Sequence, residues 1–291
     1  MAPAMTSLPM SNHCTATLTG TPILVHTWTA ATLPRKAIVI LQHGYGEYSE
    51  RYVSSHHALV LHLTSHGFEV HAMDMYGHGD SPGPRGVVHV GKAVSAHVHL
   101  RHQISKQKEN ENVPIFIFGH SLGGLVTAGS LVEDPENVQG IILTGPAFPA
   151  PLPTIARCIL GLVTALLPKR DIPVPRQPIS GLSSLPEEQK IMEDDEGLLK
   201  RNIPFLVAAT ALEVMGRIRY RLDRWKTPTL LMHGTEDRYT DPSGSRVIFG
   251  GIASADKSLR LYPGGRHELL NDADCGKALT EVLEWLEDQI K

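Results

Sequence analysis

The stretch that decides the fold is Ile115-Phe-Ile-Phe-Gly-His-Ser-Leu-Gly-Gly124, an apolar run that leads into a glycine-flanked serine. Four continuously apolar residues at its start are typical of a central strand covered on both faces. The segment 119–123 matches the pattern G-x-S-x-G, and a helical stretch follows it. A serine on such a sharp strand-to-helix turn exposes its hydroxyl at the end of the sheet, and bulk at Gly119 or Gly123 would clash there. The sequence therefore predicts Ser121 as a nucleophile.

Short apolar runs alternate with longer helical stretches on either side of this motif. We predict strands at Ala37–Gln42, Phe68–Met73, Ile115–Gly119, Gly140–Thr144, Thr229–His233 and Ser258–Tyr262. We predict helices near 52–65, 91–107, 121–133 and 277–290, and an antiparallel edge hairpin of Thr15–Leu18 with Ile23–Trp28. Strand–helix alternation indicates an α/β fold with a mostly parallel central sheet flanked by helices.

The segment 146–224 interrupts this alternation. It is rich in proline at first, for example at Pro146, Pro151, Pro153 and Pro168, and then becomes mixed and partly helical. An excursion of this length between two sheet strands is most simply a cap inserted over the active face. We therefore predict a core made of residues 1–145 and 225–291, and a cap made of residues 146–224.

A serine nucleophile needs a base that takes its proton and an acid that orients the base. Enzymes with the nucleophile on this kind of turn carry them in the chain order Ser, Asp, His. Asp237 follows the fifth predicted strand closely, and His267 follows the sixth. We predict His267 as the base and Asp237 as the acid, with Glu236 and Asp241 as competing carboxylates.

Backbone N–H groups that hold the developing oxyanion complete such a site. The loop His43-Gly-Tyr-Gly-Glu47 follows the first predicted parallel strand and contains the glycines that a close approach requires. We assign the N–H groups of Tyr45 and Leu122 as the two donors. A second glycine loop, Asp74-Met-Tyr-Gly-His-Gly-Asp-Ser81, is interpreted as scaffold that ties loops together.

Composition and the spacing of cysteines and histidines indicate which partners, which compartment and which cofactors to expect. The 291 residues carry a formal net charge of −3, which predicts no basic surface for nucleic acid. Three widely spaced cysteines favour a reducing compartment, and Met1–Thr6 lacks the pattern of a signal peptide. The longest apolar stretch is too short to span a bilayer, and no pair of histidines shows metal-ligand spacing supported by cysteines or carboxylates. We predict a cytoplasmic monomer or homodimer without metal or cofactor.

These motifs together resemble the monoacylglycerol lipase and lysophospholipase-like family of serine α/β hydrolases. The matching pieces run from about residue 20 to the C-terminus with compatible spacing and comprise His43–Tyr52, Asp74–Ser81, Gly119–Gly124, His233–Arg238 and His267–Asn271. The resemblance implies the α/β-hydrolase fold and hydrolysis of small lipid esters such as monoacylglycerol through an acyl-enzyme on Ser121. It implies the same triad and oxyanion donors, and it suggests that Glu47 and Arg51 build the polar end of the pocket near the glycerol site.

The resemblance also implies a cap that carries an apolar acyl tunnel and can rest on a membrane. One face of a predicted cap helix is apolar throughout, with Ile155, Ile159, Leu162, Val163 and Leu166. Lys169-Arg170 follow this helix, which suits contact with lipid. Three uses of the face stay open: substrate contact through Ile159, Leu162 and Leu166, docking on a membrane, or packing on the protein body.

Two departures from the family pattern concern substrate recognition. Met192–Glu196 stands where the family often has an aromatic residue before an S-D-P-like segment, and Leu270 stands where some members have a second histidine. The alternative function is therefore a specialised esterase, deacetylase or lactonase of secondary metabolism on the same triad. A non-catalytic binding protein would be expected to lack a triad member, and a dehalogenase or epoxide hydrolase would have Asp at position 121.

Overall fold

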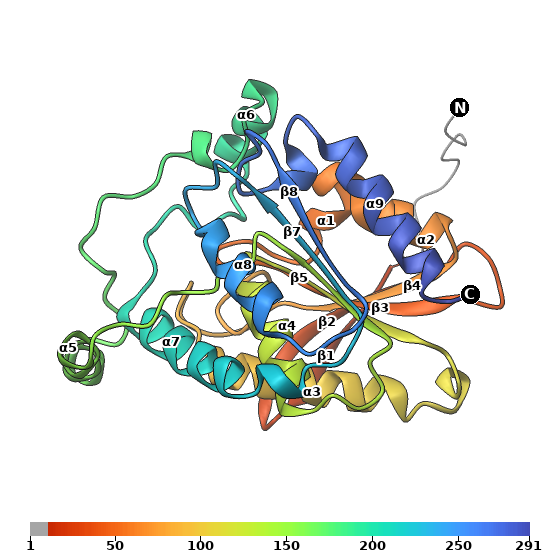
Figure 1. Ribbon diagram of the computed structural model, residues 1–291, viewed down its shortest axis with the longest axis horizontal. Helices are drawn as coiled ribbons and strands as arrows, with labels where there is room; N and C mark the ends of the chain where they lie inside the picture. Colours follow the sequence, from red (N-terminus) through yellow and green to blue (C-terminus); the bar gives the residue numbers. More distant parts are fainter. Residues whose placement is uncertain (1–10) are drawn as a thin grey trace.

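A computed structural model describes residues 11–291, in which an eight-stranded sheet lies between layers of helices (Figure 1). The strand order is β1-β2-β4-β3-β5-β6-β7-β8. The strands are β1 Ser11–Leu18, β2 Thr21–Trp28, β3 Ala37–Gln42, β4 Phe68–Met73, β5 Ile115–His120, β6 Gly140–Thr144, β7 Thr229–Gly234 and β8 Lys257–Tyr262. β1 and β2 pair in antiparallel fashion, and β2 joins β4 in the same way, whereas the other neighbours are parallel. The stretch Met1–Thr6, on which the signal-peptide prediction rests, lies outside the described residues.

The helices cover both faces of the sheet. They are α1 Arg51–Ser54, α2 Leu59–Ser65, α3 Val90–Ser105, α4 Ser121–Glu133, α5 Thr154–Leu166, α6 Pro186–Asp194, α7 Phe205–Tyr220, α8 Pro242–Gly251 and α9 Cys275–Asp288. Successive residues of a strand face opposite sides. On β3, Ile38 packs with the core that includes α3, α4 and α7, whereas Val39 packs with the core that includes α1, α2 and α9. This two-sided burial explains the continuous apolar runs and confirms the predicted α/β fold.

The predicted helix 52–65 is interrupted in the structure. It is divided into α1, a short 3₁₀ turn η1 at His56–Ala58, and α2. The three residues of the turn have φ between 51° and 52°, in the left-handed region. The Asn271 side-chain oxygen accepts hydrogen bonds from the His56 N–H and the Ser55 hydroxyl. The break thus follows from a partner far away in the sequence, which the local apolar period does not reveal.

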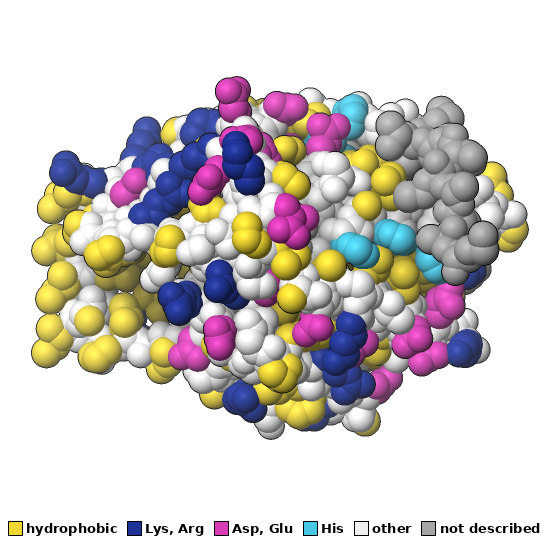
Figure 2. All heavy atoms as spheres, turned by 90° about the horizontal axis from the view of Figure 1, so that it is seen from above, with side chains coloured by type: hydrophobic (Ala, Val, Ile, Leu, Met, Phe, Trp, Pro, Cys, Tyr) yellow, Lys and Arg dark blue, Asp and Glu magenta, His cyan; other side chains and the backbone are white. Residues whose placement is uncertain are grey.

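The segment 146–224 contains α5, α6 and α7, and within the described chain it adds no strand to the sheet. α7 packs against α3 and α4 and buries Val207, Val214 and Ile218. α5 lies at the far edge of the molecule and has no buried residue (Figure 1). Hydrophobic side chains gather at that edge in the space-filling view (Figure 2). The division of the chain into a core and a cap stays a prediction.

None of the described helices is long and apolar enough to cross a lipid bilayer.

Candidate active site

Ser121 lies at the junction of β5 and α4, where the chain turns sharply. Its φ is 53°, a left-handed conformation that a non-glycine residue seldom adopts and that is often found at functional sites. A Cβ atom added to Gly119 would lie 2.6 Å from Thr127 Oγ1, and one added to Gly123 would lie 2.2 Å from the Gln42 carbonyl oxygen. The turn therefore requires glycine at both positions, as the motif predicted.

Three predicted residues from distant parts of the chain meet at this turn. His267 Nε2 lies 2.8 Å from Ser121 Oγ, and His267 Nδ1 lies 2.7 Å from Asp237 Oδ2. Asp237 follows β7 and His267 follows β8, and these strands are parallel neighbours whose carboxyl ends share one edge of the sheet. The arrangement has the order and contacts that a serine nucleophile, its base and its orienting acid require.

The competing carboxylates lie elsewhere. Glu236 is exposed, and Asp241 is exposed at the start of α8, where it accepts a hydrogen bond from the Ser243 N–H at 2.8 Å. Asp237 is buried, and its Oδ1 accepts the N–H groups of Tyr239 and Thr240 at 2.8 and 2.9 Å. Of the three carboxylates, only Asp237 is hydrogen-bonded to His267 among the described residues.

The charges at this site favour an ionised Asp237 and an imidazole that it orients. Burial alone would raise the pKa of the Asp237 carboxyl, but the charge of His267 and the hydrogen bonds from His233 and His267 hold it well below its ordinary value. Burial alone would lower the pKa of His267, but the Asp237 carboxylate outweighs it and raises the pKa. An ionised Asp237 accepts the Nδ1 proton of His267. The Nε2 lone pair is then directed at the Ser121 hydroxyl.

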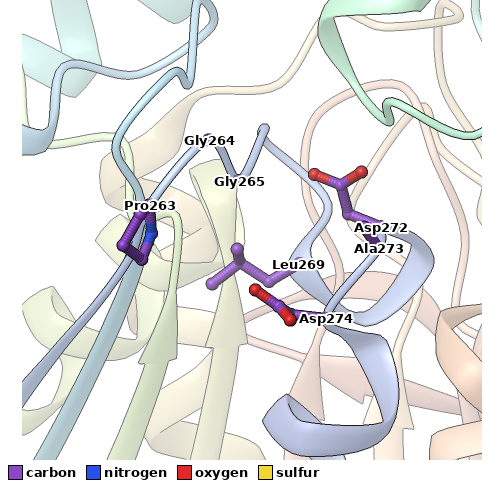
Figure 3. A pocket seen from close by; sticks show the side chains of 7 residues that line it. All are labelled: Pro263, Gly264, Gly265, Leu269, Asp272, Ala273 and Asp274. Atoms are coloured by element: carbon purple, nitrogen blue, oxygen red, sulfur yellow. The ribbon is translucent and has the colours of Figure 1, made fainter.

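A cavity of about 220 Å³ lies beside the segment that carries His267 but does not include the three residues (Figure 3). It is lined by Pro263, Gly264, Gly265, Leu269, Asp272, Ala273 and Asp274. The Asp272 carboxylate already accepts the N–H groups of Ser184 and Arg266. The position of this cavity does not suit an ester that must reach Ser121.

The predicted oxyanion loop lies directly against Ser121, the predicted nucleophile. A Cβ atom on Gly44 would lie 2.9 Å from the Cβ of Ser121. Within residues 11–291, neither the Tyr45 N–H nor the Leu122 N–H donates a hydrogen bond to another protein group. Leu122 stands in the first turn of α4, where backbone N–H groups have no partner within the helix. Both N–H groups are thus free to bind an anionic oxygen, and their role as oxyanion donors stays a proposal.

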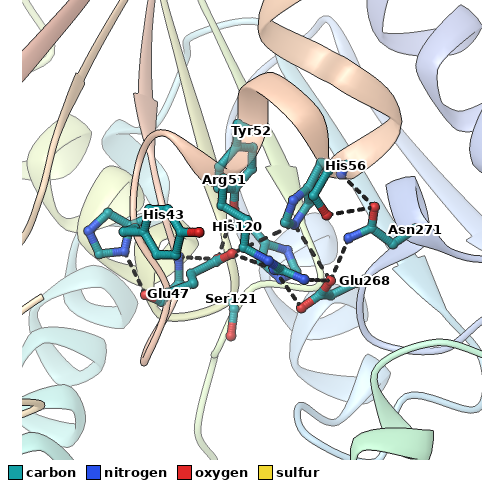
Figure 4. A network of polar contacts seen from close by, with 12 residues as sticks. His43, Glu47, Arg51, Tyr52, His56, His120, Ser121, Glu268 and Asn271 are labelled. Atoms are coloured by element: carbon teal, nitrogen blue, oxygen red, sulfur yellow. Dashed lines mark hydrogen bonds and ion pairs between the residues drawn. The ribbon is translucent and has the colours of Figure 1, made fainter. Parts of the chain in front are cut away.

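Glu47 and Arg51 occupy a buried polar network behind Ser121 (Figure 4). Glu47 Oε1 accepts hydrogen bonds from the Gly44 N–H and, at 2.8 Å, from the Tyr52 hydroxyl. Its Oε2 lies 2.9 Å from Arg51 Nη1. The two side chains are only 5% and 4% exposed. Protein groups therefore occupy much of the hydrogen-bonding capacity of both side chains, and Glu47 holds the predicted oxyanion loop at Gly44. Contact of Glu47 and Arg51 with glycerol stays a prediction.

Glu268 is the main residue of this network that sequence reasoning missed. Two Arg51 nitrogens lie 3.0 and 2.9 Å from its carboxylate oxygens, and Asn271 Nδ2 lies 2.6 Å from one of them. Burial alone would raise the pKa of Glu268, but Arg51 and His56 lower it to about 2. In the sequence, the position of Glu268 directly after the predicted base His267 could have marked it as a candidate. The pairing of Glu268 with Arg51 depends on a contact between distant segments and could not be predicted.

Two further imidazoles lie in this network. The ring centroids of His120 and His267 are 4.9 Å apart, and those of His56 and His120 are 5.6 Å apart. Burial, together with the charge of His267, lowers the pKa of His120, and burial with Arg51 lowers that of His56 to about 3. These two rings are therefore neutral near pH 7 and add no positive charge beside His267.

Comparison with known proteins gives the family of the chain. Residues 34–274 match the family described as "Serine aminopeptidase, S33". The chain belongs to this family. The monoacylglycerol lipase of Mycolicibacterium smegmatis is 29% identical over 97% of this chain and 99% of its own length. The human monoglyceride lipase is 30% identical over 80% of this chain and 76% of its own length.

A solved structure extends the similarity to three dimensions. The crystal structure of the monoacylglycerol lipase of Paleococcus ferrophilus aligns with a TM-score of 0.80 and 28% identity, covering 92% of this chain and 99% of that one.

The predicted resemblance and the α/β-hydrolase fold are confirmed. The S33 family match and the named relatives likewise confirm the prediction of a serine hydrolase that cleaves carboxylic esters.

Glu268→Gln is expected to move the acidic limb of the pH–rate profile to lower pH. The Glu268 carboxylate is one of the charges that raise the pKa of His267, although Asp237 contributes more. Without this charge, the pKa of His267 falls, so the neutral base persists at lower pH. The measurement is kcat/KM for a soluble ester as a function of pH, which reports groups of the free enzyme.

The matched control is Glu284→Gln, which removes an exposed carboxylate from α9. It should leave the acidic limb unchanged. If Glu268→Gln lowers kcat/KM equally at every pH, Glu268 acts only through the positions of Arg51 and Asn271.

Proposed function

We propose that the protein hydrolyses small lipid esters, monoacylglycerol above all, through an acyl-enzyme on Ser121. The observation that carries this proposal is the continuous chain of contacts from Ser121 through His267 to Asp237. The two relatives and the solved structure described above are all named as monoacylglycerol or monoglyceride lipases, which supports the substrate class.

The proposed reaction has two halves. Ser121 Oγ attacks the ester carbonyl while His267 Nε2 takes its proton, and the N–H groups of Tyr45 and Leu122 hold the oxyanion. His267 then donates this proton to the leaving alcohol, which departs as the acyl-enzyme forms. A water molecule attacks the acyl-enzyme with His267 again as base, releasing the fatty acid and restoring Ser121. Asp237 stays ionised throughout and stabilises the imidazolium.

The apolar face of α5 supports a lipid substrate. Ile155, Ile159, Leu162 and Leu166 are exposed by 76, 58, 65 and 72%, whereas Val163 is half-buried. A contiguous exposed apolar surface marks a site of contact with a membrane or another molecule. Lys169 and Arg170 directly after the helix are also exposed and would be attracted to anionic lipid. We therefore propose that this face rests on the lipid surface from which the substrate enters, rather than packing on the protein body.

The Leu162→Ser/Leu166→Ser double variant is expected to bind lipid vesicles at least about tenfold more weakly, because two apolar side chains no longer enter the bilayer interface. Turnover of soluble short-chain esters should stay unchanged because the residues around Ser121 are intact. The measurements are co-sedimentation with anionic vesicles and kcat/KM for soluble esters of increasing acyl length.

The control is Val247→Ser, which removes an apolar side chain of similar exposure, 57%, from α8. If vesicle binding persists in the double variant while the preference for long soluble acyl chains disappears, the two leucines line the acyl pocket instead. If neither measurement changes, the α5 face has no role in lipid recognition.

Competition labelling tests the substrate class itself. Labelling of Ser121 by a fluorophosphonate should be slowed more strongly by monoacylglycerols than by acetyl esters or lactones. The opposite order would favour the alternative of a specialised esterase, deacetylase or lactonase on the same triad.

A further inference from the structure

Three side chains of types that bind metal ions, those of His13, His26 and Glu50, lie close together and take no part in the contacts of Ser121, His267 and Asp237. His13 on β1 and His26 on β2 are cross-strand partners, and their Nδ1 atoms are 2.8 Å apart. Glu50, which precedes α1, places Oε1 3.3 Å from His13 Nε2. One ligand atom from each of these three residues lies within 4.8 Å of the other two. Sequence spacing predicted no metal site, because the hairpin register and a separate loop bring these residues together.

His26 is held in the form that a metal ligand needs. Its side chain is buried, and its Nε2 lies 3.1 Å from Asp74 Oδ2. The Asp74 carboxylate also accepts the N–H groups of Ser49 at 2.8 Å and Asp80 at 3.1 Å. His26 therefore donates its Nε2 proton to Asp74, which leaves the Nδ1 lone pair directed at His13. A carboxylate on the far nitrogen is the usual support of a metal-binding histidine.

A neutral His13 cannot donate a hydrogen bond to both of the acceptors that face its ring. His13 Nδ1 faces a lone pair of His26, and His13 Nε2 faces a Glu50 carboxylate oxygen. A neutral imidazole has one N–H and can donate to only one of these two acceptors. A cation among the three side chains would interact favourably with the His26 nitrogen, the Glu50 oxygen and one nitrogen of His13 at the same time.

The positions of the three side chains allow a metal ion to bind after a small movement of His13. Tetrahedral zinc bonds of about 2.0–2.1 Å place two nitrogen ligands about 3.3 Å apart, so His13 would have to move slightly away from His26. The side chains of His13 and Glu50 are 40% and 48% exposed and can rotate, whereas His26 is fixed by Asp74. One rigid ligand and two adjustable ones are sufficient for such a site.

We propose that His13, His26 and Glu50 bind a divalent ion of the zinc class, with water completing the coordination. Two imidazoles and one carboxylate suit Zn²⁺ or Co²⁺ better than Mg²⁺ or Ca²⁺, which prefer oxygen ligands. The ion would connect the β1–β2 hairpin to the loop that leads into α1. Because the unfolded chain lacks this arrangement, binding stabilises the fold.

The test uses the full chain with Zn²⁺ and Co²⁺ as probes. Isothermal titration should show one equivalent of Zn²⁺ bound, thermal unfolding should shift to higher temperature, and bound Co²⁺ should give visible absorption bands. His13→Ala and Glu50→Gln alter exposed side chains, so both variants should fold. Each should weaken binding by at least about 10- to 100-fold, the loss that removal of an outer-shell partner of a ligand already causes. His26→Ala is less informative because it removes a buried side chain.

Two controls separate this site from adventitious binding. Cys14→Ser removes the exposed thiol next to His13, and His99→Ala removes an exposed histidine on α3. Neither should change the affinity for Zn²⁺. The proposal is overturned if the chain binds no stoichiometric Zn²⁺, if His13→Ala and Glu50→Gln bind as tightly as the unchanged protein, or if Mg²⁺ gives the same stabilisation.

Discussion

Ser121→Ala is expected to reduce ester turnover by about 10⁶-fold and to abolish labelling by a fluorophosphonate. The substitution removes the hydroxyl that lies 2.8 Å from His267 Nε2 and leaves every other group of the site in place. Alanine keeps the Cβ atom, so the cost of the left-handed backbone at φ 53° is unchanged. We therefore expect the free energy of unfolding to change by less than about 1 kcal/mol.

The measurements are initial rates with a soluble ester, gel-based labelling and thermal unfolding. Ser95→Ala, which removes an exposed serine hydroxyl from α3, should behave as the unchanged protein in all three. Persistent labelling of a folded Ser121→Ala variant would show that another residue is the nucleophile.

Asp237→Asn is expected to reduce kcat by about 10⁴-fold while the protein folds normally. The asparagine oxygen can still accept the N–H groups of Tyr239 and Thr240, which keeps the loop in place. Its NH₂ group would face His267 Nδ1 and favour the opposite tautomer, with the proton on Nε2. That tautomer cannot take the proton of Ser121, and the imidazolium also loses its counter-charge.

Asp241→Asn separates this role from general damage to the loop. Asp241 caps α8 through the Ser243 N–H, so its replacement is expected to cost at most about 1 kcal/mol of stability and to leave kcat unchanged. If Asp241→Asn lowers kcat more than Asp237→Asn does, the acid has been assigned to the wrong residue. The comparison requires rate measurements below the unfolding temperature of both variants.

Local sequence was sufficient to predict most elements of the fold. The runs at β3, β4 and β6 were predicted with the bounds that the structure has. Sheet strands buried on both faces are continuously apolar, and this pattern is contained within a few residues. The helix predicted at 52–65 is the main exception, because its break depends on Asn271, which is distant in the sequence.

The sequence alone also identified Ser121, Asp237 and His267 as candidates for the site. Each follows a recognisable strand, and together the three stand in the chain order Ser, Asp, His. Asp237 was preferred as the acid, although Glu236 and Asp241 lie close to it along the chain. Geometry favours Asp237, because its carboxylate is buried and its Oδ2 lies 2.7 Å from His267 Nδ1.

Only the tertiary structure decided how the charges around this site are paired. Glu47, Arg51 and Glu268 form one buried ion network that links the predicted oxyanion loop to the segment after His267. Likewise, only the hairpin register and the preceding loop of α1 bring His13, His26 and Glu50 together. A strand or a sharp turn is specified by neighbouring residues. The partner of a buried charge or an imidazole is set by how distant segments pack, which no local pattern in the sequence records.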